Sequence, residues 1–362
     1  MTNGSILNLK LFRISLISAF FLFAYVFANP VLAEGNAPDT AKKAFDAKAT
    51  ILEHIGDSHV WPVVSEKWLP LPVIVHSDNG LEFFSSGKLM PEGTIYKGEK
   101  NSYKLEENKI KIVDASGNID EAANKHLKDF SITRNVVSMF MTMAILLIIF
   151  LSVAGSYKKR IGKAPKGLQS FLEPVILFVR DDIAVPNIGS LKAKRFLPLL
   201  LTIFFFILIN NLFGMIPFFP GGYNLTGNIA VTAVLSVIIF FVVNLNGNKH
   251  YWKHIFVPNP WWLFFIMIPV EIVGIFTKPI ALMIRLFANI TAGHILILSL
   301  ISLIFIFKTI AVAPVSIVFV VFMDAIELLV AFLQAYIFTL LAALFIGMAI
   351  EEHHSDHGAE IL

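Results

Sequence analysis

The chain has 362 residues, of which 56% are hydrophobic and 15% are charged. Soluble domains are about half apolar and about a quarter charged, so this balance indicates an integral membrane protein. The formal net charge of +3 comes with no basic patch that would indicate nucleic-acid binding, and the absence of cysteine excludes disulfide scaffolds and thiolate metal sites.

The first 33 residues have the pattern of a secretory signal peptide. Lys10 and Arg13 precede a short apolar stretch over residues 14–27, and a cleavage site is predicted before Glu34. The apolar stretch is shorter than the ~20 residues of a spanning helix, which favours cleavage over the alternative, an uncleaved anchor. In either case the next segment is expected outside the cytoplasm, and a secretory signal is typical of a bacterial protein.

Residues 34–130 predict a small extracytoplasmic domain that contains β-structure. Two apolar stretches, 71–76 and 81–84, flank the turn signal at 78–80 and predict a hairpin. Residues 109–113 alternate between polar and apolar and predict another strand. No site chemistry is indicated in this domain.

A membrane domain is predicted over residues 131–352, followed by a short cytoplasmic tail at 353–362. Five spanning segments are expected, at 136–154, 196–216, 229–243, 262–307 and 310–350. The last two exceed the ~20 residues that cross a bilayer, so they must tilt strongly, bend or extend beyond the lipid. The predicted fold class is therefore an all-α integral membrane protein with a long closing hairpin. The three histidines of the tail predict a solvated segment rather than a metal site.

The loops between these spans predict the orientation of the chain. A basic loop follows the first span, which places it in the cytoplasm because Lys and Arg accumulate there. Its basic residues are Lys158, Lys159, Arg160, Lys163 and Lys166. The loop 218–228 has no Lys or Arg, which suits the outer side. Residues 168–179 carry an apolar stripe and predict an interfacial helix, with a cytoplasmic helix packed on a partner as the alternative.

Ionisable residues gather in the last two spans, whereas the first three spans have none in their apolar cores. They are Glu271, Lys278, Arg285, His294, Asp324 and Glu327. A charged side chain at the bilayer centre costs ~2.5–3.5 kcal/mol, so a sequence that keeps several in one hairpin is expected to use them. Buried ion pairs that only hold the helices together are the structural alternative.

Spacing predicts that Arg285 and His294 lie on opposite faces of the first long helix. Glu271 and Lys278 precede Arg285 at intervals of seven residues and share its face. Asn289 joins that face four residues on, whereas His294, nine residues on, points the other way. Because arginine keeps its proton in proteins, it acts as a fixed charge, whereas histidine and glutamate can relay protons.

Other polar residues of the membrane domain receive more limited predictions. Glu327 and Gln334 are seven residues apart and share a face of the last helix. Asp324 is expected at the outer water surface, although it is close enough to Glu327 to influence its charge. Asn210 and Asn224 are expected to be hydrogen-bonded polar residues rather than channel lining.

Three stretches resemble the subunit a family of F-type ATP synthases. They are TKPIALMIRLFANITAGH at 277–294, ELLVAFLQAYIFTLL at 327–341 and NLFGMIP at 211–217. In that family an arginine faces a rotating ring of hairpin subunits that carry an essential carboxylate, and the matching position is Arg285. Two aqueous half-channels lead to the ring. The positions that match their polar lining are Asn211, Glu271, Asn289, His294, Glu327 and Gln334.

The resemblance covers residues from about 130 to 352. Many bacterial members carry Glu at the position of His294 and His at that of Glu327, so this chain is similar to the mitochondrial arrangement. It also has Gly214 where some bacterial relatives carry an acid, and these departures leave the order of proton relay open. The domain before residue 130 lies outside the common core.

This resemblance implies a non-catalytic stator subunit that couples proton flow to ATP synthesis in a bacterial inner membrane. It implies no cofactor or metal. The implied partners are the c-ring proteolipid subunits, the peripheral-stalk subunit b, other ATP synthase subunits, lipid and protons. A free-standing ion channel or secondary transporter is the alternative, since it would also explain the buried charges. An intramembrane hydrolase is disfavoured, because no H-E-x-x-H or G-x-S-x-G motif is present.

Overall fold

The computed structural model describes residue 51 and residues 56–64, 67–106, 108–114, 116–216, 220–256, 264–307 and 312–351. The predictions of a signal peptide and of a C-terminal tail lie outside these residues. Within them, five helices are long and apolar enough to cross a membrane, and short strands precede them. The predicted fold class is therefore confirmed.

The N-terminal part is a small β-domain in which all of the paired strands are antiparallel. Three sheets are described, with strand orders β1-β2, β4-β3-β8 and β5-β6-β7. The elements are β1 (Val60–Val64), β2 (Lys67–Pro70), β3 (Pro72–Ser77), β4 (Gly80–Ser85), η1 (Ser86–Leu89), β5 (Ile95–Lys97), β6 (Ser102–Glu106), β7 (Lys109–Val113), α3 (Glu121–His126) and β8 (Lys128–Asp129).

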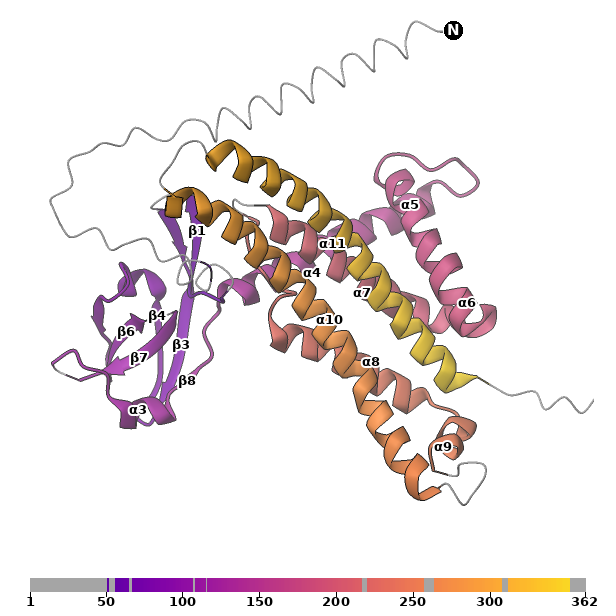
Figure 1. Ribbon diagram of the computed structural model, residues 1–362, viewed down its shortest axis with the longest axis horizontal. Helices are drawn as coiled ribbons and strands as arrows, with labels where there is room; N and C mark the ends of the chain where they lie inside the picture. Colours follow the sequence, from indigo (N-terminus) through magenta and orange to yellow (C-terminus); the bar gives the residue numbers. More distant parts are fainter. Residues whose placement is uncertain are drawn as a thin grey trace, which may run out of the picture. The chain divides into compact units, whose positions relative to one another are not determined.

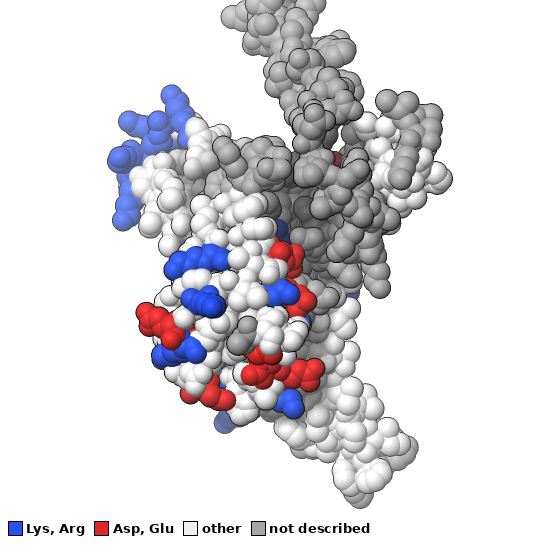
Figure 2. All heavy atoms as spheres, turned by 90° about the vertical axis from the view of Figure 1, so that its left-hand side faces the viewer, with Lys and Arg blue, Asp and Glu red and all other residues white. Residues whose placement is uncertain are grey.

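Both predicted strand features of this domain are present. Strands β3 and β4 pair as a hairpin in which Ser77 lies opposite Gly80, and Gly80 has a φ of 109° that favours glycine. Strand β7 covers the predicted residues 109–113 and pairs with β6. Figure 2 shows Lys and Arg interspersed with Asp and Glu over the surface of this domain, as expected for a part that faces water.

The membrane part consists of helices of very unequal length. They are α4 (Arg134–Lys159), α5 (Leu168–Phe178), the π-helical turn η2 (Val179–Ala184), α6 (Val185–Ile188), α7 (Ser190–Met215), α8 (Ile229–Asn246), α9 (Lys249–Phe256), α10 (Phe264–Phe307) and α11 (Val312–Ile350). Helix α7 begins six residues before the predicted span 196–216. The hydrophobic pattern marked the apolar segment rather than the helix end, because the first turns of α7 carry the basic residues Lys192, Lys194 and Arg195.

Helices α10 and α11 form a long antiparallel hairpin (Figure 1). They contain 44 and 39 residues. At 1.5 Å per residue they are about 66 and about 58 Å long, roughly twice the ~30 Å of a bilayer core. The expectation that both helices must tilt, bend or leave the lipid therefore holds.

The core of the membrane part lies where α7 packs against α11. Leu200 and Phe204 of α7 are fully buried. Many of the buried residues of α11 are small, namely Ala331, Ala335, Ala342, Ala343, Gly347 and Ala349, and Gly347 lies against Asn187 of α6. Small side chains let membrane helices approach closely, which gains van der Waals packing where no hydrophobic drive exists between helices.

The predicted helix over 168–179 is present as α5 and continues through η2 into α6. It packs on α4, α7 and α11, with Leu172 and Val179 buried, whereas Phe171 is 74% exposed. One face of this segment is thus covered by the chain's own helices. The exposed Phe171 belongs to the apolar stripe and is compatible with both lipid and a partner.

Candidate functional site

Arg285 lies on the outward side of α10. Leu282, Leu286 and Ile290 follow one another at intervals of four residues and are buried against the core, while Arg285 itself is exposed. Its guanidinium makes no hydrogen bond or ion pair with any described residue. A permanent cation is therefore presented from a helix whose other exposed residues are mostly apolar, such as Ile284.

His294 and Glu327 form a buried pair on the opposite side of α10. The His294 Nε2 atom is 3.9 Å from the Glu327 Oε1 atom, and the two side chains are 14% and 8% exposed. Arg285 and His294 thus lie on different faces, as the spacing predicted. The pair joins one member of α10 to one member of α11, which places two proton-exchanging groups within one water of each other.

Two glycines make room for this pair. A Cβ atom on Gly293 would lie 3.1 Å from Glu327 Oε1, and a Cβ atom on Gly214 would lie 3.6 Å from His294 Nε2 and 3.1 Å from the carbonyl oxygen of Tyr223. The two distances of 3.1 Å are shorter than ordinary van der Waals contact, whereas the 3.6 Å to His294 is an ordinary contact. Glycine at these positions therefore lets the two side chains approach the backbone of α7 and α10.

Asn289 and Gln334 form a second link between α10 and α11. The Asn289 amide donates to Gln334 Oε1 at 2.8 Å. Gln334 is 1% exposed, and its own Nε2 donor has no partner among the described residues. Buried amides that lack a partner are the groups that ordered water satisfies, so this position suits a hydrated path.

Asn211 approaches the same region from α7. Its amide donates to the carbonyl oxygen of Ala331 at 3.3 Å, and Thr226 Oγ1 donates to Asn211 Oδ1 at 2.7 Å. Ala331 is one turn beyond Glu327 on α11. The structure therefore brings five of the predicted site residues into one region: Asn211, Asn289, His294, Glu327 and Gln334.

A cavity of about 230 Å³ lies between α10 and α11 beside this region. Its polar lining comes from Asn289 and Glu327, and the rest is apolar apart from the backbone at Gly293. Since a water molecule occupies ~30 Å³ in the liquid, the cavity has room for several. Glu327 thus borders both the buried pair and a space that water can fill.

Glu271 is not part of this group. It is half-buried near the start of α10, close to Tyr251 of α9. Burial raises the pKa of Tyr251, and the negative charge of Glu271 raises it further. Lys278 directs its ammonium over the Phe345 ring at 5.5 Å from the ring centre. Glu271 therefore lies at the far end of the hairpin from the His294–Glu327 pair.

Two asparagines outside the predicted site behave differently from each other. Asn210 accepts from Thr142 Oγ1 at 2.9 Å and donates to the carbonyl oxygen of Phe206, so the expectation that it is a satisfied polar residue is confirmed. The same expectation for Asn224 was wrong. Asn224 is 6% exposed, and neither amide atom has a partner within the described part of the chain.

Sequence reasoning missed the role of the glycines and of the loop that follows α7. The signal for Gly293 was a glycine inside an apolar helix, which often marks a close approach of side chain and backbone. Thr226 and Tyr223 gave no comparable signal, because their contacts join segments that are distant along the chain.

Comparisons with known proteins bear on both parts of the chain. The ATP synthase A chain family matches residues 136–347. A family described as a domain of unknown function matches residues 50–130.

Individual relatives agree with the first match. A protein named ATP synthase subunit a from Chloroherpeton thalassium is 50% identical over 238 residues, covering 64% of this chain and 70% of the relative. ATP synthase subunit a 2 from Chlorobaculum tepidum is 48% identical over 241 residues, covering 64% and 67%. ATP synthase subunit a from Myxococcus xanthus is 44% identical over 238 residues, covering 64% and 77%.

Proposed function

Because this chain belongs to the ATP synthase A chain family, we propose that it carries protons through two aqueous half-channels to a rotating c-ring. Membership supports a multi-pass membrane subunit of an ATP synthase, and we infer that ATP chemistry belongs to other subunits. The finer proposal concerns the path of the proton and the residue that couples it to rotation.

The exposure of Arg285 is the observation that carries this proposal. A guanidinium on the outward face of an apolar helix is costly in lipid unless an anion on another chain compensates it. A ring of carboxylates that passes Arg285 supplies such an anion. Since arginine keeps its proton, it favours the ionised carboxylate beside it and repels a proton that would leak straight through.

The buried polar group supplies the path on one side of this barrier. A proton passes Asn211 and then the His294–Glu327 pair, which is joined to the cavity between α10 and α11. It neutralises a ring carboxylate, which then moves through lipid at far lower desolvation cost. Asn289 and Gln334 line the same route, between Arg285 and the pair along α10.

The second half-channel opens at the other end of the hairpin. Glu271 lies there, and we assign it to the proton exit on the cytoplasmic side. Each proton that crosses supplies ~2.3 kcal/mol per 100 mV of membrane potential. The peripheral-stalk subunit b holds this chain against the torque, in a bacterial inner membrane with the N-terminal domain outside and the C-terminus in the cytoplasm.

Replacement of Arg285 tests the proposal. In inverted membrane vesicles that contain the whole complex, Arg285→Ala is expected to abolish ATP-driven proton pumping while the complex still assembles, because the anion loses its fixed partner. Arg195→Ala removes an exposed cation at the start of α7 and serves as the matched control, with pumping expected to persist. Normal pumping by Arg285→Ala in an assembled complex would reject the proposed role.

Co-purification separates this proposal from a free-standing channel or transporter. If the chain functions in the complex, mild detergent extraction yields it together with a proteolipid ring and a soluble ATPase. Recovery of the chain alone, with intact ion conduction in reconstituted vesicles, would support the alternative.

A further inference from the structure

The α7–α8 loop, described over residues 220–228, is folded into the protein rather than laid over its surface. Residues 223–227 are all buried. Connecting segments normally run over the surface, because buried backbone leaves polar groups that must be satisfied. The burial of this loop therefore requires specific contacts on several sides.

Three membrane helices, α7, α10 and α4, contact the loop through hydrogen bonds. Thr226 Oγ1 donates to Asn211 of α7 at 2.7 Å, and Thr291 Oγ1 of α10 donates to the carbonyl oxygen of Gly227 at 3.5 Å. The Tyr223 hydroxyl lies 3.2 Å from Thr142 Oγ1 of α4. The loop is thus fastened beside the His294 imidazole, with which it shares the space next to Gly214.

The N-terminal domain also packs on the loop, through Trp61. The Trp61 ring of β1 meets the Tyr223 ring edge-to-face, with ring centres 6.0 Å apart. Trp61 is 2% exposed, and Tyr223 and Leu225 are each 1% exposed in the same apolar cluster. A domain outside the common core of the family therefore packs directly on a loop that touches the proton path.

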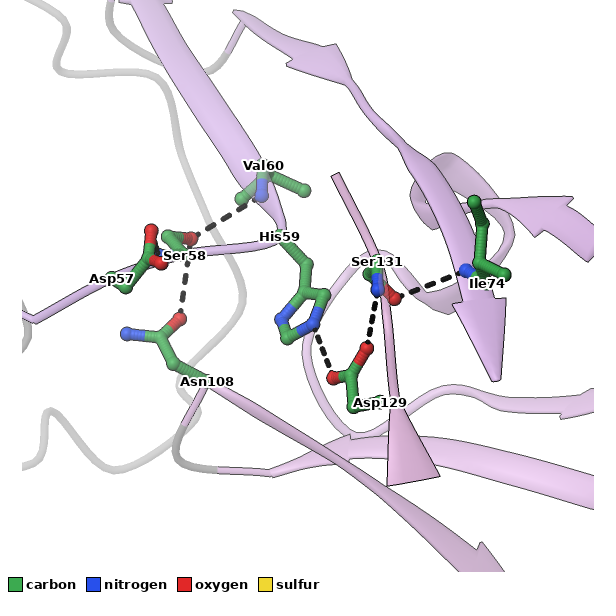
Figure 3. A network of polar contacts seen from close by, with 8 residues as sticks. All are labelled: Asp57, Ser58, His59, Val60, Ile74, Asn108, Asp129 and Ser131. Carbon is green, nitrogen blue, oxygen red and sulfur yellow. Dashed lines mark hydrogen bonds and ion pairs between the residues drawn. The ribbon is translucent and has the colours of Figure 1, made fainter. Parts of the chain in front are cut away.

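Trp61 is itself held firmly in place. Two residues before it, His59 Nε2 lies 2.8 Å from Asp129 Oδ2 of β8, and this pair belongs to the polar network of Figure 3. The backbone of Ser58 also binds the start of α4, because the backbone amide of Arg134 donates to the carbonyl oxygen of Ser58 at 2.8 Å. The segment that leads into β1 is thus bound both to β8 and to the start of α4.

Asn224 is the polar residue of this buried loop that has no partner. Both of its amide atoms are buried without a hydrogen bond to any described residue. The amide lies against Gly227, where any Cβ would overlap it. A buried amide with four unused hydrogen-bonding positions is a group that water satisfies, and its neighbours Tyr223 and Thr226 reach the proton path.

We propose that the α7–α8 loop is the inlet of the His294 half-channel, that Asn224 positions water in it, and that Trp61 of the N-terminal domain holds the inlet in shape. The inference rests on the proposed function, since it assigns an inlet to that path. In this proposal the N-terminal domain fixes the conformation of the α7–α8 loop, past which protons enter the half-channel. Trp61 and Asn224 are positioning residues, because neither exchanges the proton itself.

Cysteine labelling tests the inlet directly, because the chain has no cysteine of its own. In right-side-out vesicles that contain the complete complex, Asn224→Cys is expected to react with a charged, membrane-impermeant thiosulfonate about tenfold faster than Leu225→Cys, since the reacting thiolate needs water. Leu225 is the matched control, as the next residue of the same loop with an apolar environment. Equal rates at the two positions would overturn the assignment of Asn224.

Proton conduction tests the role of the amide. Asn224→Leu keeps the size of the side chain and is expected to lower passive proton conductance about tenfold, the effect of one lost hydrogen bond of ~1.4 kcal/mol. Asn224→Gln restores an amide and is expected to recover most of it. Unchanged conductance in Asn224→Leu, or no recovery in Asn224→Gln, contradicts the role.

Variants of Trp61 test whether this side chain keeps the α7–α8 loop in its conformation. In Trp61→Ala the loop loses its cover, so Leu225→Cys is expected to gain reactivity, whereas Trp61→Phe keeps an aromatic ring and leaves it unreactive. Unchanged labelling in Trp61→Ala overturns this role of Trp61, and the Asn224 experiments decide the inlet even if that variant fails to assemble. If the unsubstituted complex conducts no protons, the proposed function fails, whereas the labelling rates still report whether water reaches the loop.

Discussion

Among the described residues, the N-terminal domain and the α10–α11 hairpin each bury one carboxylate, and they surround it in opposite ways. Glu82 of β4 is 6% exposed and accepts four hydrogen bonds. Its donors are the backbone amides of Glu99, Lys100 and Asn101 and the Tyr103 hydroxyl, at 3.0 to 3.2 Å. Glu327 is 7% exposed, and among the described residues its one ion-pair partner is His294 at 3.9 Å.

Under the proposed function, this difference separates a structural anchor, Glu82, from a proton carrier, Glu327. Four fixed donors hold the Glu82 carboxylate in one geometry, so it organises the loop around it. A carboxylate with few fixed donors, such as Glu327, keeps the freedom to take up and release a proton. Burial alone does not distinguish the two, whereas the number of fixed donors does.

The largest expected effect comes from removing the carrier. Glu327→Gln keeps the size of the side chain but cannot exchange a proton, so passive proton conductance of vesicles is expected to fall about 10²-fold. His294→Gln is expected to act on the same step, and the double variant should fall no further than the more severe single one. If Glu327→Gln conducted protons as well as the unsubstituted complex, Glu327 would not be a proton carrier, and both carboxylates would be structural.

Removing the anchor is expected to change stability instead. Glu82→Gln replaces one acceptor oxygen with a donor that faces other donors, so the free energy of unfolding of the N-terminal domain should fall by ~1–3 kcal/mol. The measurement is hydrogen exchange of the Asn101 amide in the intact complex. Glu99→Gln, at an exposed side chain of the same loop, is the control and should change stability by less than ~0.5 kcal/mol.

If Glu82→Gln left the Asn101 amide as protected as before, the four hydrogen bonds would not be the anchor that their geometry indicates. Greater loss of protection in Glu99→Gln would lead to the same conclusion.

A smaller effect is expected from moving the carrier without removing it. In Gly293→Ala the new methyl group would lie 3.1 Å from Glu327 Oε1, so the carboxylate must shift by a few tenths of an ångström relative to His294. Proton conductance is expected to fall about threefold, which corresponds to less than ~1 kcal/mol. Gly274→Ala lies on the same helix with open space at its Cβ and is the matched control. Equal conductance of the two variants would show that the pair tolerates displacement.

The two regions also differ in how far the sequence predicted them. In the hairpin the cost of a charge in lipid made each ionisable residue informative, so the opposite faces of Arg285 and His294 followed from spacing alone. The hydrophobic pattern likewise predicted both long helices to within a few residues. It did not predict which side chains meet across the helices, because the Asn289–Gln334 link depends on the register between α10 and α11.

In the N-terminal domain only the local features were predictable. The hairpin of β3 and β4 followed from a turn signal between two apolar stretches, and β7 followed from alternation. The Glu82 anchor, the partner of Trp61 and the isolated amide of Asn224 all depend on contacts between residues at least seventeen positions apart or on a buried loop. Polar residues are common in a water-facing domain, so the presence of a polar residue such as Glu82 gave no signal of a special role.

The smallest effect tests a carboxylate of intermediate kind, Asp129, which pairs with His59 at the base of the domain. Burial acts to raise the pKa of Asp129, but hydrogen bonds from His59 and Ser131 outweigh it and hold that pKa below its ordinary value. The stabilisation is therefore complete above the ordinary pKa of ~3.9 and is lost as the pH falls below it. Relative to its intrinsic rate, exchange of the Ser131 amide, which donates to Asp129 Oδ1 at 2.8 Å, should accelerate below about pH 4. In Asp129→Asn the same amide should show no such pH dependence, and a persisting one would assign the titration to another group. Asp129, with two fixed partners, would then behave as an anchor that acid releases, intermediate between Glu82 with its four donors and the proposed proton carrier Glu327.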